Sequence, residues 1–319
     1  MKPTIIVDFE DYTSFDLLWV KPIVSQWFNI EYYDPSKNYN PATHAIMTKY
    51  QVAEKPGWYT KFKEQNFKII VEHLWDSNVT NQTQVENNII TLYCPNWMWY
   101  LAGWEFEYYG YNSYRPNRTR DRSFFMPMNN PRWHRTMALE KLKPLLDTAW
   151  YSYNCQGIHL PGDRKKEEIT VSWQRYLNPD WYDRTAFSVV AESYMRNTSN
   201  PSAGTEVSEK IFKPLAYYHP FVTFGSQHTL KYLHEQGFET FPELFDETYD
   251  LIADDLQRHD AVQKSIWSAV ERWQRNELEI LPETVQKLEH NHQRVFDRNL
   301  TVDKFYNEVV VDILEFLSQ

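Results

Sequence analysis

Short runs of apolar residues, mostly β-branched or aromatic, recur along the first two thirds of the chain, with polar segments between them. A short, continuously apolar run bounded by turn-forming residues is typical of a strand that is buried on both faces. The pattern therefore predicts strands at residues 4–8, 30–33, 45–47, 67–71, 88–93, 124–128, 149–153, 186–191 and 221–224.

Amphipathic segments lie between several of these runs and predict helices. Ser14 is expected to cap a helix that ends near Phe28, and another helix is expected to start within residues 129–135. Thr240 and Glu243 have the spacing of a capping box, which predicts a further helix start. The first two of these helices fall between predicted strands, as they do in folds with parallel sheets.

From residue 251 to the C-terminus the pattern is helical throughout. Pro282 interrupts it, because proline cannot continue a helix but fits well at the start of one. Thr301 is expected to cap the last helix. Strands that alternate with helices indicate an α/β fold with parallel, doubly wound sheets, and residues 1–115 are long enough for one Rossmann-like domain of this kind.

The segment 185–225 combines a buried strand, a polar loop, a helix and a second strand, and so predicts a βαβ unit. Glu192 and Ser193 follow the first strand, at the end where ligands bind in open α/β sheets. Thr205 is expected to cap the helix. Pro214 lies inside the helix and is expected to kink or shorten it.

Three polar residues, Ser208, Glu209 and Lys210, fall in the first turn of that helix. Backbone N–H groups at a helix start favour anions, and a lysine there can neutralise a phosphate. Glu192 or Glu209 can accept hydrogen bonds from the vicinal hydroxyls of a sugar. The combination suits a nucleotide-diphosphate sugar, although an ordinary βαβ unit with a solvated helix start accounts for the same spacing.

A second group of cationic residues follows the predicted strand at 124–128. Arg132, His134 and Arg135 occupy a strand-to-helix turn, where guanidinium groups and a helix start together favour phosphate.

Composition narrows the class of protein. The chain has 319 residues, enough for two domains, and no Gly-x-Gly-x-x-Gly segment, which disfavours a dinucleotide-dependent dehydrogenase. The net charge of −10 argues against a protein whose whole surface binds nucleic acid. Two cysteines cannot form a disulfide framework. No signal-peptide pattern or membrane-spanning run occurs, so we expect a cytoplasmic location, in the host cytoplasm for a phage-encoded protein.

Two motifs in the predicted βαβ unit at 185–225 resemble the donor-binding region of the α-1,3-fucosyltransferase family. These motifs are Phe-Ser-Val-Val-Ala-Glu-Ser at 187–193 and Thr-Glu-Val-Ser-Glu-Lys at 205–210. In that family a strand ending in Glu-Asn-Ser precedes a Thr-Glu-Lys helix; this chain has Glu-Ser instead. The segments 129–135 and 237–241 are similar to parts of a looser group of bacterial and phage-encoded glycosyltransferases. The resemblance covers about residues 124–260.

The resemblance implies a glycosyltransferase with two Rossmann-like domains facing across a cleft, the GT-B arrangement. Residues 1–115 would be the acceptor-side domain and residues 116–280 the nucleotide-sugar-binding domain. Residues 281–319 would be helices that pack back on the first domain. The implied donor is a nucleotide-diphosphate sugar, with GDP as the first guess, and the implied acceptor is a hydroxyl group. We expect inversion at the sugar, and no metal, since the chain lacks an Asp-x-Asp segment.

The same resemblance implies roles for individual residues. Arg135, with Arg132 as second choice, would contact the diphosphate, while Glu209 and Lys210 would hold the ribose and the diphosphate. The full set of expected donor-binding residues is Arg132, Arg135, Glu192, Ser193, Ser208, Glu209 and Lys210.

The acceptor hydroxyl also needs a general base. Carboxylates and a histidine near strand ends of the first domain are the candidates, and Glu72 and Asp76 are preferred over Asp8, Glu10 and His73.

Two other classes of function stay open. One is a phage-type transferase that glycosylates hydroxymethylated DNA bases, with the basic stretch 115–135 along the phosphates and aromatic side chains holding an extruded base. The other is a non-catalytic carbohydrate-binding protein of the same fold, which the aromatic content of 17% would serve.

Overall fold

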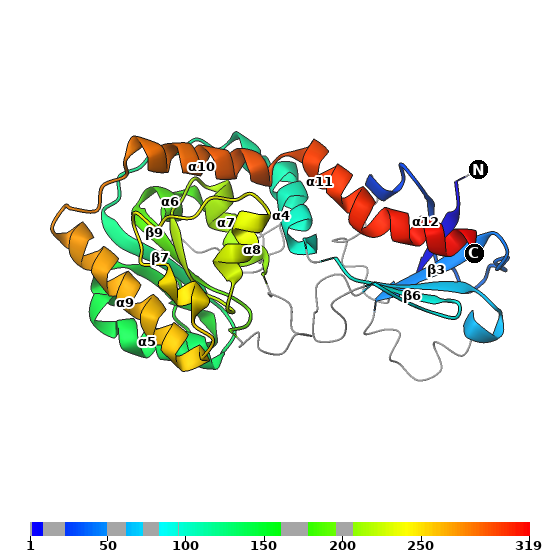
Figure 1. Cartoon of the computed structure of the whole chain (residues 1–319), viewed down its shortest axis with the longest axis horizontal. Helices are drawn as coiled ribbons and strands as arrows, with labels where there is room; N and C mark the ends of the chain where they lie inside the picture. The colour runs from blue at the N-terminus through cyan, green and yellow to red at the C-terminus, as the bar shows by residue number, and fades with distance from the viewer. Residues whose placement is uncertain are drawn as a thin grey trace. The chain divides into compact units, whose positions relative to one another are not determined.

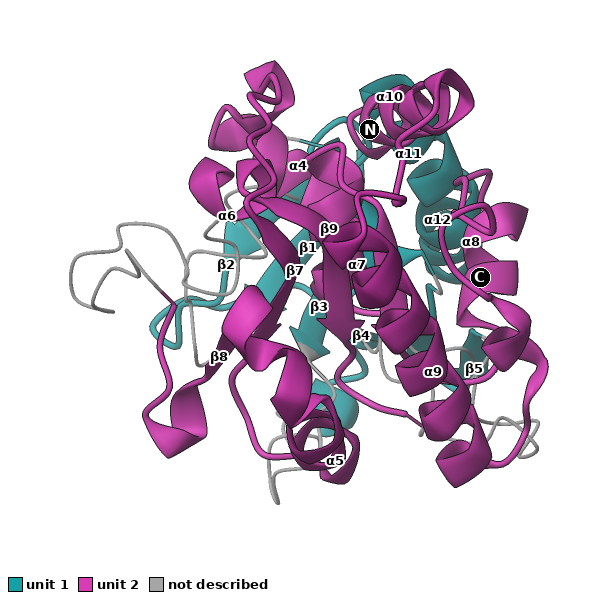
Figure 2. Ribbon diagram, turned by 90° about the vertical axis from the view of Figure 1, so that its left-hand side faces the viewer, with its two compact units in different colours: residues 1–101, 298–319 teal, residues 102–297 magenta. Residues whose placement is uncertain are grey.

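The computed structural model describes residues 2–8, 23–49, 62–72, 83–94, 96–160, 178–195 and 207–319. It confirms an α/β protein with sheets of mainly parallel strands. The chain divides into two compact units, coloured separately in Figure 2. Unit 1 contains residues 1–101 and 298–319, and unit 2 contains residues 102–297.

Unit 1 is built on a six-stranded sheet with the order β2-β1-β3-β4-β6-β5. Its five parallel strands were all predicted from their apolar runs; they are β1 (Thr4–Asp8), β2 (Asn29–Tyr32), β3 (His44–Lys49), β4 (Lys68–Glu72) and β6 (Ile89–Leu92). The antiparallel edge strand β5 (Gln84–Glu86) was missed, because all three of its residues are exposed and leave no apolar run.

The core of unit 1 lies on its central strands. Ile6, Ile46 and Ile69 are fully buried, and they pack with Phe62 and Phe67 in one cluster. Burial of such side chains is the main source of stability for the sheet.

The last helices of the chain pack on unit 1. They are α11 (Arg298–Phe305), the π-helical segment η6 (Tyr306–Val310) and α12 (Val311–Ser318). The Lys68 ammonium donates to the carbonyl oxygens of Phe316 and Leu317, both at 2.9 Å. Thr301 was expected to cap the last helix but lies inside α11, where its hydroxyl donates to the carbonyl of Arg298.

Unit 2 contains a four-stranded, fully parallel sheet with the order β10-β9-β7-β8. All four strands were predicted; they are β7 (Arg122–Met128), β8 (Trp150–Tyr153), β9 (Thr185–Ala191) and β10 (Phe221–Phe224). In this order β7 connects to β8 on one side, whereas its neighbour β9 connects to β10 on the other. The strand order therefore reverses between β7 and β9. The carboxyl ends of these two strands form a topological switch point.

Helices cover both faces of the unit 2 sheet (Figure 1). Right-handed crossovers that leave in opposite directions place their helices on opposite faces. Accordingly α5 (Trp133–Leu142) packs against α9 (Asp255–Gln274), and α7 (Glu209–Ala216) packs against α10 (Pro282–Val295). The shorter segments are α6 (Pro179–Asp183), α8 (Thr229–Glu235) and the 3₁₀ turns Tyr111–Ser113, Lys143–Thr148, Asn154–Gln156 and Thr248–Leu251.

The division between the units falls inside helix α4 (Trp97–Tyr108) rather than at residue 115. The ring of Trp97 contacts Phe305 of unit 1 at 6.0 Å between centroids. Further along the helix, Gly103 lies so close to the carbonyl of Val295 in unit 2 that an added Cβ would be 2.3 Å from its oxygen. One helix thus serves both units. The expected segment 281–319 is divided as well, because α10 belongs to unit 2 and the later helices to unit 1.

No helix begins at the predicted capping box of Thr240 and Glu243. The Thr240 hydroxyl instead donates to the Glu247 carboxylate at 2.7 Å, and the Phe241 N–H donates to the same carboxylate at 2.8 Å. Glu243 pairs with Lys287 of α10 at 2.8 Å. The groups that would form the helix cap are instead bound to Glu247 and Lys287. The motif therefore forms a turn that packs against α10.

We expect Glu247 to make stability depend on pH. Burial raises the pKa of Glu247 to about 7, so the folded chain binds this proton more tightly than the unfolded chain. The protonated carboxyl contributes fully to the free energy of unfolding below the ordinary carboxyl pKa of 4.5. This contribution, up to about 3 kcal/mol, is lost as the pH rises toward 7. Urea titrations of Glu247→Gln at pH 4.5 and pH 7 are expected to show a smaller difference than the unsubstituted chain. An unchanged difference would contradict this assignment.

Candidate functional site

The predicted donor-binding residues meet at the carboxyl edge of the unit 2 sheet. Strands β7 and β9 are paired in parallel, with Phe124 opposite Phe187 and Phe125 opposite Ser188. The turn after β7 and the turn after β9 therefore start side by side at the switch point. The sequence placed two polar clusters at two strand ends, and the pairing of these strands brings the clusters together.

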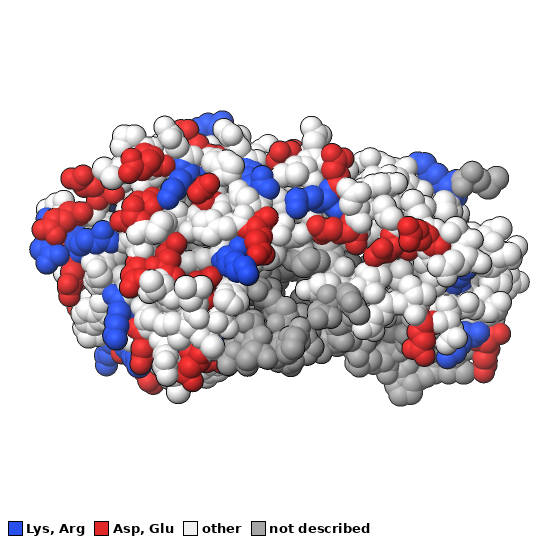
Figure 3. All heavy atoms as spheres, viewed as in Figure 1, with Lys and Arg blue, Asp and Glu red and all other residues white. Residues whose placement is uncertain are grey.

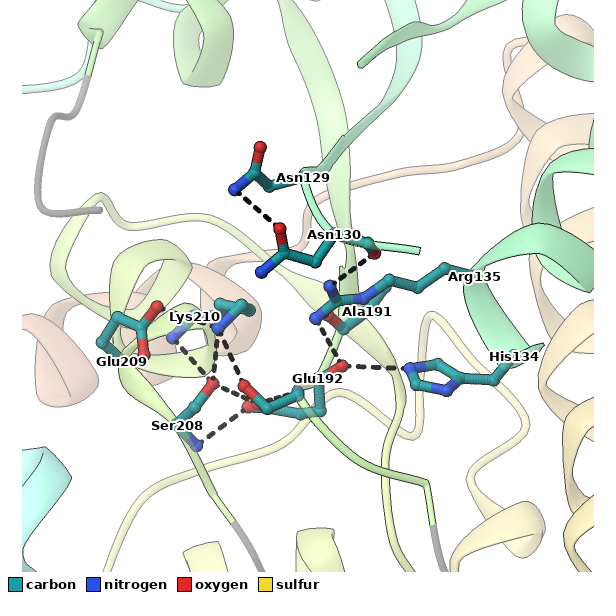
Figure 4. A network of polar contacts seen from close by, with 10 residues as sticks. Asn129, Asn130, His134, Arg135, Ala191, Glu192, Ser208, Glu209 and Lys210 are labelled. Atoms are coloured by element: carbon teal, nitrogen blue, oxygen red, sulfur yellow. Dashed lines mark hydrogen bonds and ion pairs between the residues drawn. The ribbon is translucent and has the colours of Figure 1, made fainter. Parts of the chain in front are cut away.

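Glu192, the first residue after β9, is completely buried and joins the two turns (Figure 4). Its main-chain carbonyl accepts hydrogen bonds from His134 Nε2 at 3.0 Å and Arg135 Nη2 at 2.7 Å, both from helix α5. Its carboxylate faces the other way and accepts from the Ser208 hydroxyl and from the N–H groups of Ser193 and Ser208, at 3.2 and 3.3 Å. Both ends of this residue are therefore held.

Burial raises the pKa of the Glu192 carboxyl, although the charge of Lys210 and the hydrogen bonds from Ser208 oppose the shift. A fully buried carboxylate with these donors already in place is poorly available to a sugar hydroxyl. Of the two carboxylates considered for that role, Glu209 is the better placed.

Ser208 is the N-cap of α7, with its hydroxyl accepting from the N–H of Lys210 at 3.4 Å. The helix thus begins at Glu209, later than expected from Thr205, which lies outside the described residues. The predicted effect of Pro214 is consistent with the structure, since α7 ends soon after it, at Ala216. Ser208 therefore organises the helix start and orients Glu192 at the same time.

The ammonium group of Lys210 lies at the centre of the polar cluster. It donates to Ser193 Oγ at 3.1 Å, Ser208 Oγ at 3.2 Å and Glu209 Oε1 at 2.8 Å. Its side chain keeps 29% exposure, against 10% for that of Glu209. Lys210 is thus held by neighbours and still reaches solvent, as a ligand-binding cation must.

Arg135 has a different place from the one expected. It is 3% exposed, and its guanidinium donates to the carbonyl oxygens of Asn130, Ala191 and Glu192 at 3.1, 3.1 and 2.7 Å. Burial lowers its pKa, and the charge of Glu192 partly offsets this shift. Because these donors are engaged and buried, Arg135 is not an accessible diphosphate contact. It fastens the turn after β7 to the end of β9.

Arg132 is the accessible cation on this turn. It is exposed and serves as the N-cap residue of α5, whose first turn has no acidic side chain. Its guanidinium lies over the ring of Tyr194, 4.9 Å from the centroid, and donates no hydrogen bond to a described residue. The second choice from the sequence is therefore the better candidate, and burial, which the motif does not encode, decides between the two.

His134 supports the site without titrating near neutral pH. Burial lowers its pKa to about 4, so the imidazole is neutral and Nε2 carries the proton donated to Glu192. A neutral ring adds no charge to the cluster and fixes the end of β9.

The expected general bases belong to unit 1. Glu72 is the last residue of β4, with its backbone in register with Lys49 of β3. The side chain of Glu72, and the whole of His73, Asp76 and Glu10, lie outside the described residues.

The basic stretch 115–135 is not one continuous track. Its first part lies before β7, where the Tyr114 hydroxyl and the Asn117 N–H both donate to Asp183. Arg132 lies beyond the other end of β7, and seven residues of strand span about 20 Å. On the face shown in Figure 3, acidic and basic side chains also intermix over unit 2. This arrangement does not favour binding along a nucleic-acid backbone.

The described residues include no group of three or more histidine, cysteine, aspartate or glutamate side chains placed to hold a metal ion. No family model matches this chain, and no curated protein matches it either. Among the helices in the described ranges, none has the length and apolar character that a bilayer-spanning segment needs.

Proposed function

We propose that the protein is a glycosyltransferase and that unit 2 binds the nucleotide-diphosphate part of a sugar donor at the switch point between β7 and β9. One observation carries the proposal. Arg132 is an exposed cation on the turn after β7, and Lys210 is a partly exposed cation at the start of α7, the helix that follows β9. The buried Glu192 links these two segments. Ligands in open α/β sheets bind at such edges.

In this proposal the diphosphate lies between Lys210 and Arg132. Each cation is at the start of a helix, α7 and α5 respectively, so the helix dipoles add to the charge attraction. Lys210 is now paired with Glu209. On binding, the ammonium turns to the phosphate, and the Glu209 carboxylate accepts hydrogen bonds from the ribose hydroxyls.

The proposed reaction transfers the sugar to a hydroxyl acceptor. The acceptor oxygen forms a bond to the anomeric carbon while the bond from that carbon to the diphosphate oxygen breaks. The acceptor proton passes to a base of unit 1, for which Glu72 and Asp76 are the candidates from the sequence. Direct displacement of this kind inverts the anomeric centre. Unit 2 would hold the donor and unit 1 the acceptor, which is the division of roles in GT-B transferases.

Charge stabilisation of the departing diphosphate is the main contribution of the described residues to catalysis. Lys210 and Arg132 offset the negative charge that grows on the leaving oxygen. Because these protein cations can do so, we propose a reaction that needs no divalent metal.

A thermal-shift panel of GDP, UDP, CDP, ADP and dTDP, with and without magnesium, tests the proposal. A ligand present at about 100 times its dissociation constant adds about 2.7 kcal/mol to the free energy of unfolding, which raises the melting temperature measurably. We expect stabilisation by at least one nucleotide without magnesium, with GDP as the first candidate. A chain that responds to none of them, with or without the metal, would contradict a nucleotide-diphosphate site.

Two measurements, donor turnover and the salt dependence of DNA binding, separate the remaining alternatives. A carbohydrate-binding protein would not consume any nucleotide sugar. A transferase acting on modified DNA would bind duplexes more tightly as salt is lowered. The separation of the basic stretch into two parts favours neither a DNA track nor a DNA acceptor.

A further inference from the structure

Trp133 is a large aromatic side chain left half in solvent beside the proposed diphosphate site. It is the first residue of α5, directly after Arg132, and it is 43% exposed. The buried residues of α5 are His134, Arg135, Ala138 and Leu142, so Trp133 is not part of the core under that helix.

The indole ring is supported by histidines below it. Its centroid lies 5.6 Å from that of His134 and 5.9 Å from that of His259 on α9. Both histidines are buried, and His259 Nε2 donates to the His134 carbonyl at 3.1 Å. His259 in turn packs on Phe224 at the end of β10, at 4.6 Å between centroids. These edge and tilted ring contacts connect the end of β10 to the exposed indole and support it.

A supported aromatic ring with an exposed side is suited to stack on a planar group. Tyr194, which follows β9, is less suitable because the guanidinium of Arg132 already lies over its ring. Trp133 directly follows Arg132 at the start of α5, the same helix start at which that cation would hold the diphosphate of a nucleoside.

We propose that Trp133 stacks on the base of the nucleotide donor and selects purines over pyrimidines. This inference rests on the proposed function, since it assigns the base to the same site. A purine covers more of an indole than a pyrimidine does, and stacking strength grows with the area covered. Discrimination by stacking requires no hydrogen bond from the tryptophan to the edge of the base.

Isothermal titration calorimetry of Trp133→Ala tests the proposal with GDP, ADP, UDP and inorganic pyrophosphate. We expect the substitution to weaken GDP and ADP by roughly tenfold or more, and UDP by less. Pyrophosphate, which has no base, is expected to bind as it does to the unsubstituted chain. Trp133→Phe keeps an aromatic face and should retain much of the purine affinity.

Tyr108→Ala is the matched control, because Tyr108 is another exposed aromatic residue of unit 2, at 65% exposure, on the last turn of α4. It should change none of these affinities. Melting curves of each variant show whether the fold is kept.

The possible failures are distinguishable. If the unsubstituted chain binds neither pyrophosphate nor any nucleotide, the proposed function itself fails. If it binds both, and Trp133→Ala keeps full GDP affinity, only the stacking proposal is overturned. Equal losses for pyrophosphate and GDP would also overturn it, because they would show that Trp133 supports the shape of the site rather than the base.

Discussion

Replacing Lys210 by alanine is expected to weaken nucleoside-diphosphate binding about a hundredfold while the fold is kept. The ammonium is the partly exposed cation of the polar cluster, with contacts to Ser193, Ser208 and Glu209. A charged hydrogen bond to phosphate contributes about 1.5–3 kcal/mol, and its loss leaves the Glu209 carboxylate to repel the ligand. Calorimetry with the nucleotide that gives the largest thermal shift measures the effect.

The stability cost of this substitution is expected to be small. The side chain of Lys210 is 29% exposed, so its removal leaves no void in the core. The pKa of the buried Glu192 is expected to rise further, because the charge of Lys210 opposes the shift that burial causes. Lys231→Ala provides the control, since Lys231 is an exposed lysine of α8 whose side chain pairs only with Glu235 at 3.7 Å among the described residues. Unchanged nucleotide affinity in Lys210→Ala would remove the lysine from the site.

Arg135→Met is expected to destabilise unit 2 by about 3 kcal/mol or more. Methionine fills similar space but leaves the carbonyls of Asn130 and Ala191 without the guanidinium, and Glu192 with His134 alone at its carbonyl oxygen. Buried acceptors deprived of a charged donor carry a large desolvation cost. Urea unfolding followed by circular dichroism measures the loss.

Arg132→Met is the matched comparison, because it removes the same side chain three residues earlier in the same turn. It should leave the urea midpoint nearly unchanged, since Arg132 is exposed, and should weaken pyrophosphate binding instead. The assignment of the two arginines would be reversed by the opposite pattern, a stable Arg135→Met chain that no longer binds pyrophosphate.

Most of the strands could be predicted from sequence because strands buried on both faces need continuous apolar runs. Strand β9 illustrates this, since all seven of its residues are buried. Strand β5 and the turn at Thr240 could not be predicted. The first has no buried face, and the second depends on Glu247, whose carboxylate satisfies groups that a local motif assigns to a helix cap.

The cap of α7 shows the same limit at shorter range. Thr205 and Ser208 both have side chains that can cap a helix, and the pattern favoured the earlier one. The structure begins the helix after Ser208, whose hydroxyl also reaches Glu192, sixteen residues earlier in the chain. The Ser208 hydroxyl is held both by the helix start and by Glu192, which follows β9. The second of these contacts exists only in the folded chain.

Local sequence therefore determined which apolar runs form the parallel strands. It also determined that polar and cationic groups follow β7 and β9, because burial and helix starts constrain residue types nearby. The strand order that makes β7 and β9 neighbours was decided by tertiary structure, as was the division of labour between the two arginines. Arg135 and Glu192 are separated by 57 residues, yet the hydrogen bond between them decides that Arg135 is buried and Arg132 is exposed. Contacts at that separation depend on how the whole sheet assembles, and no local pattern encodes them.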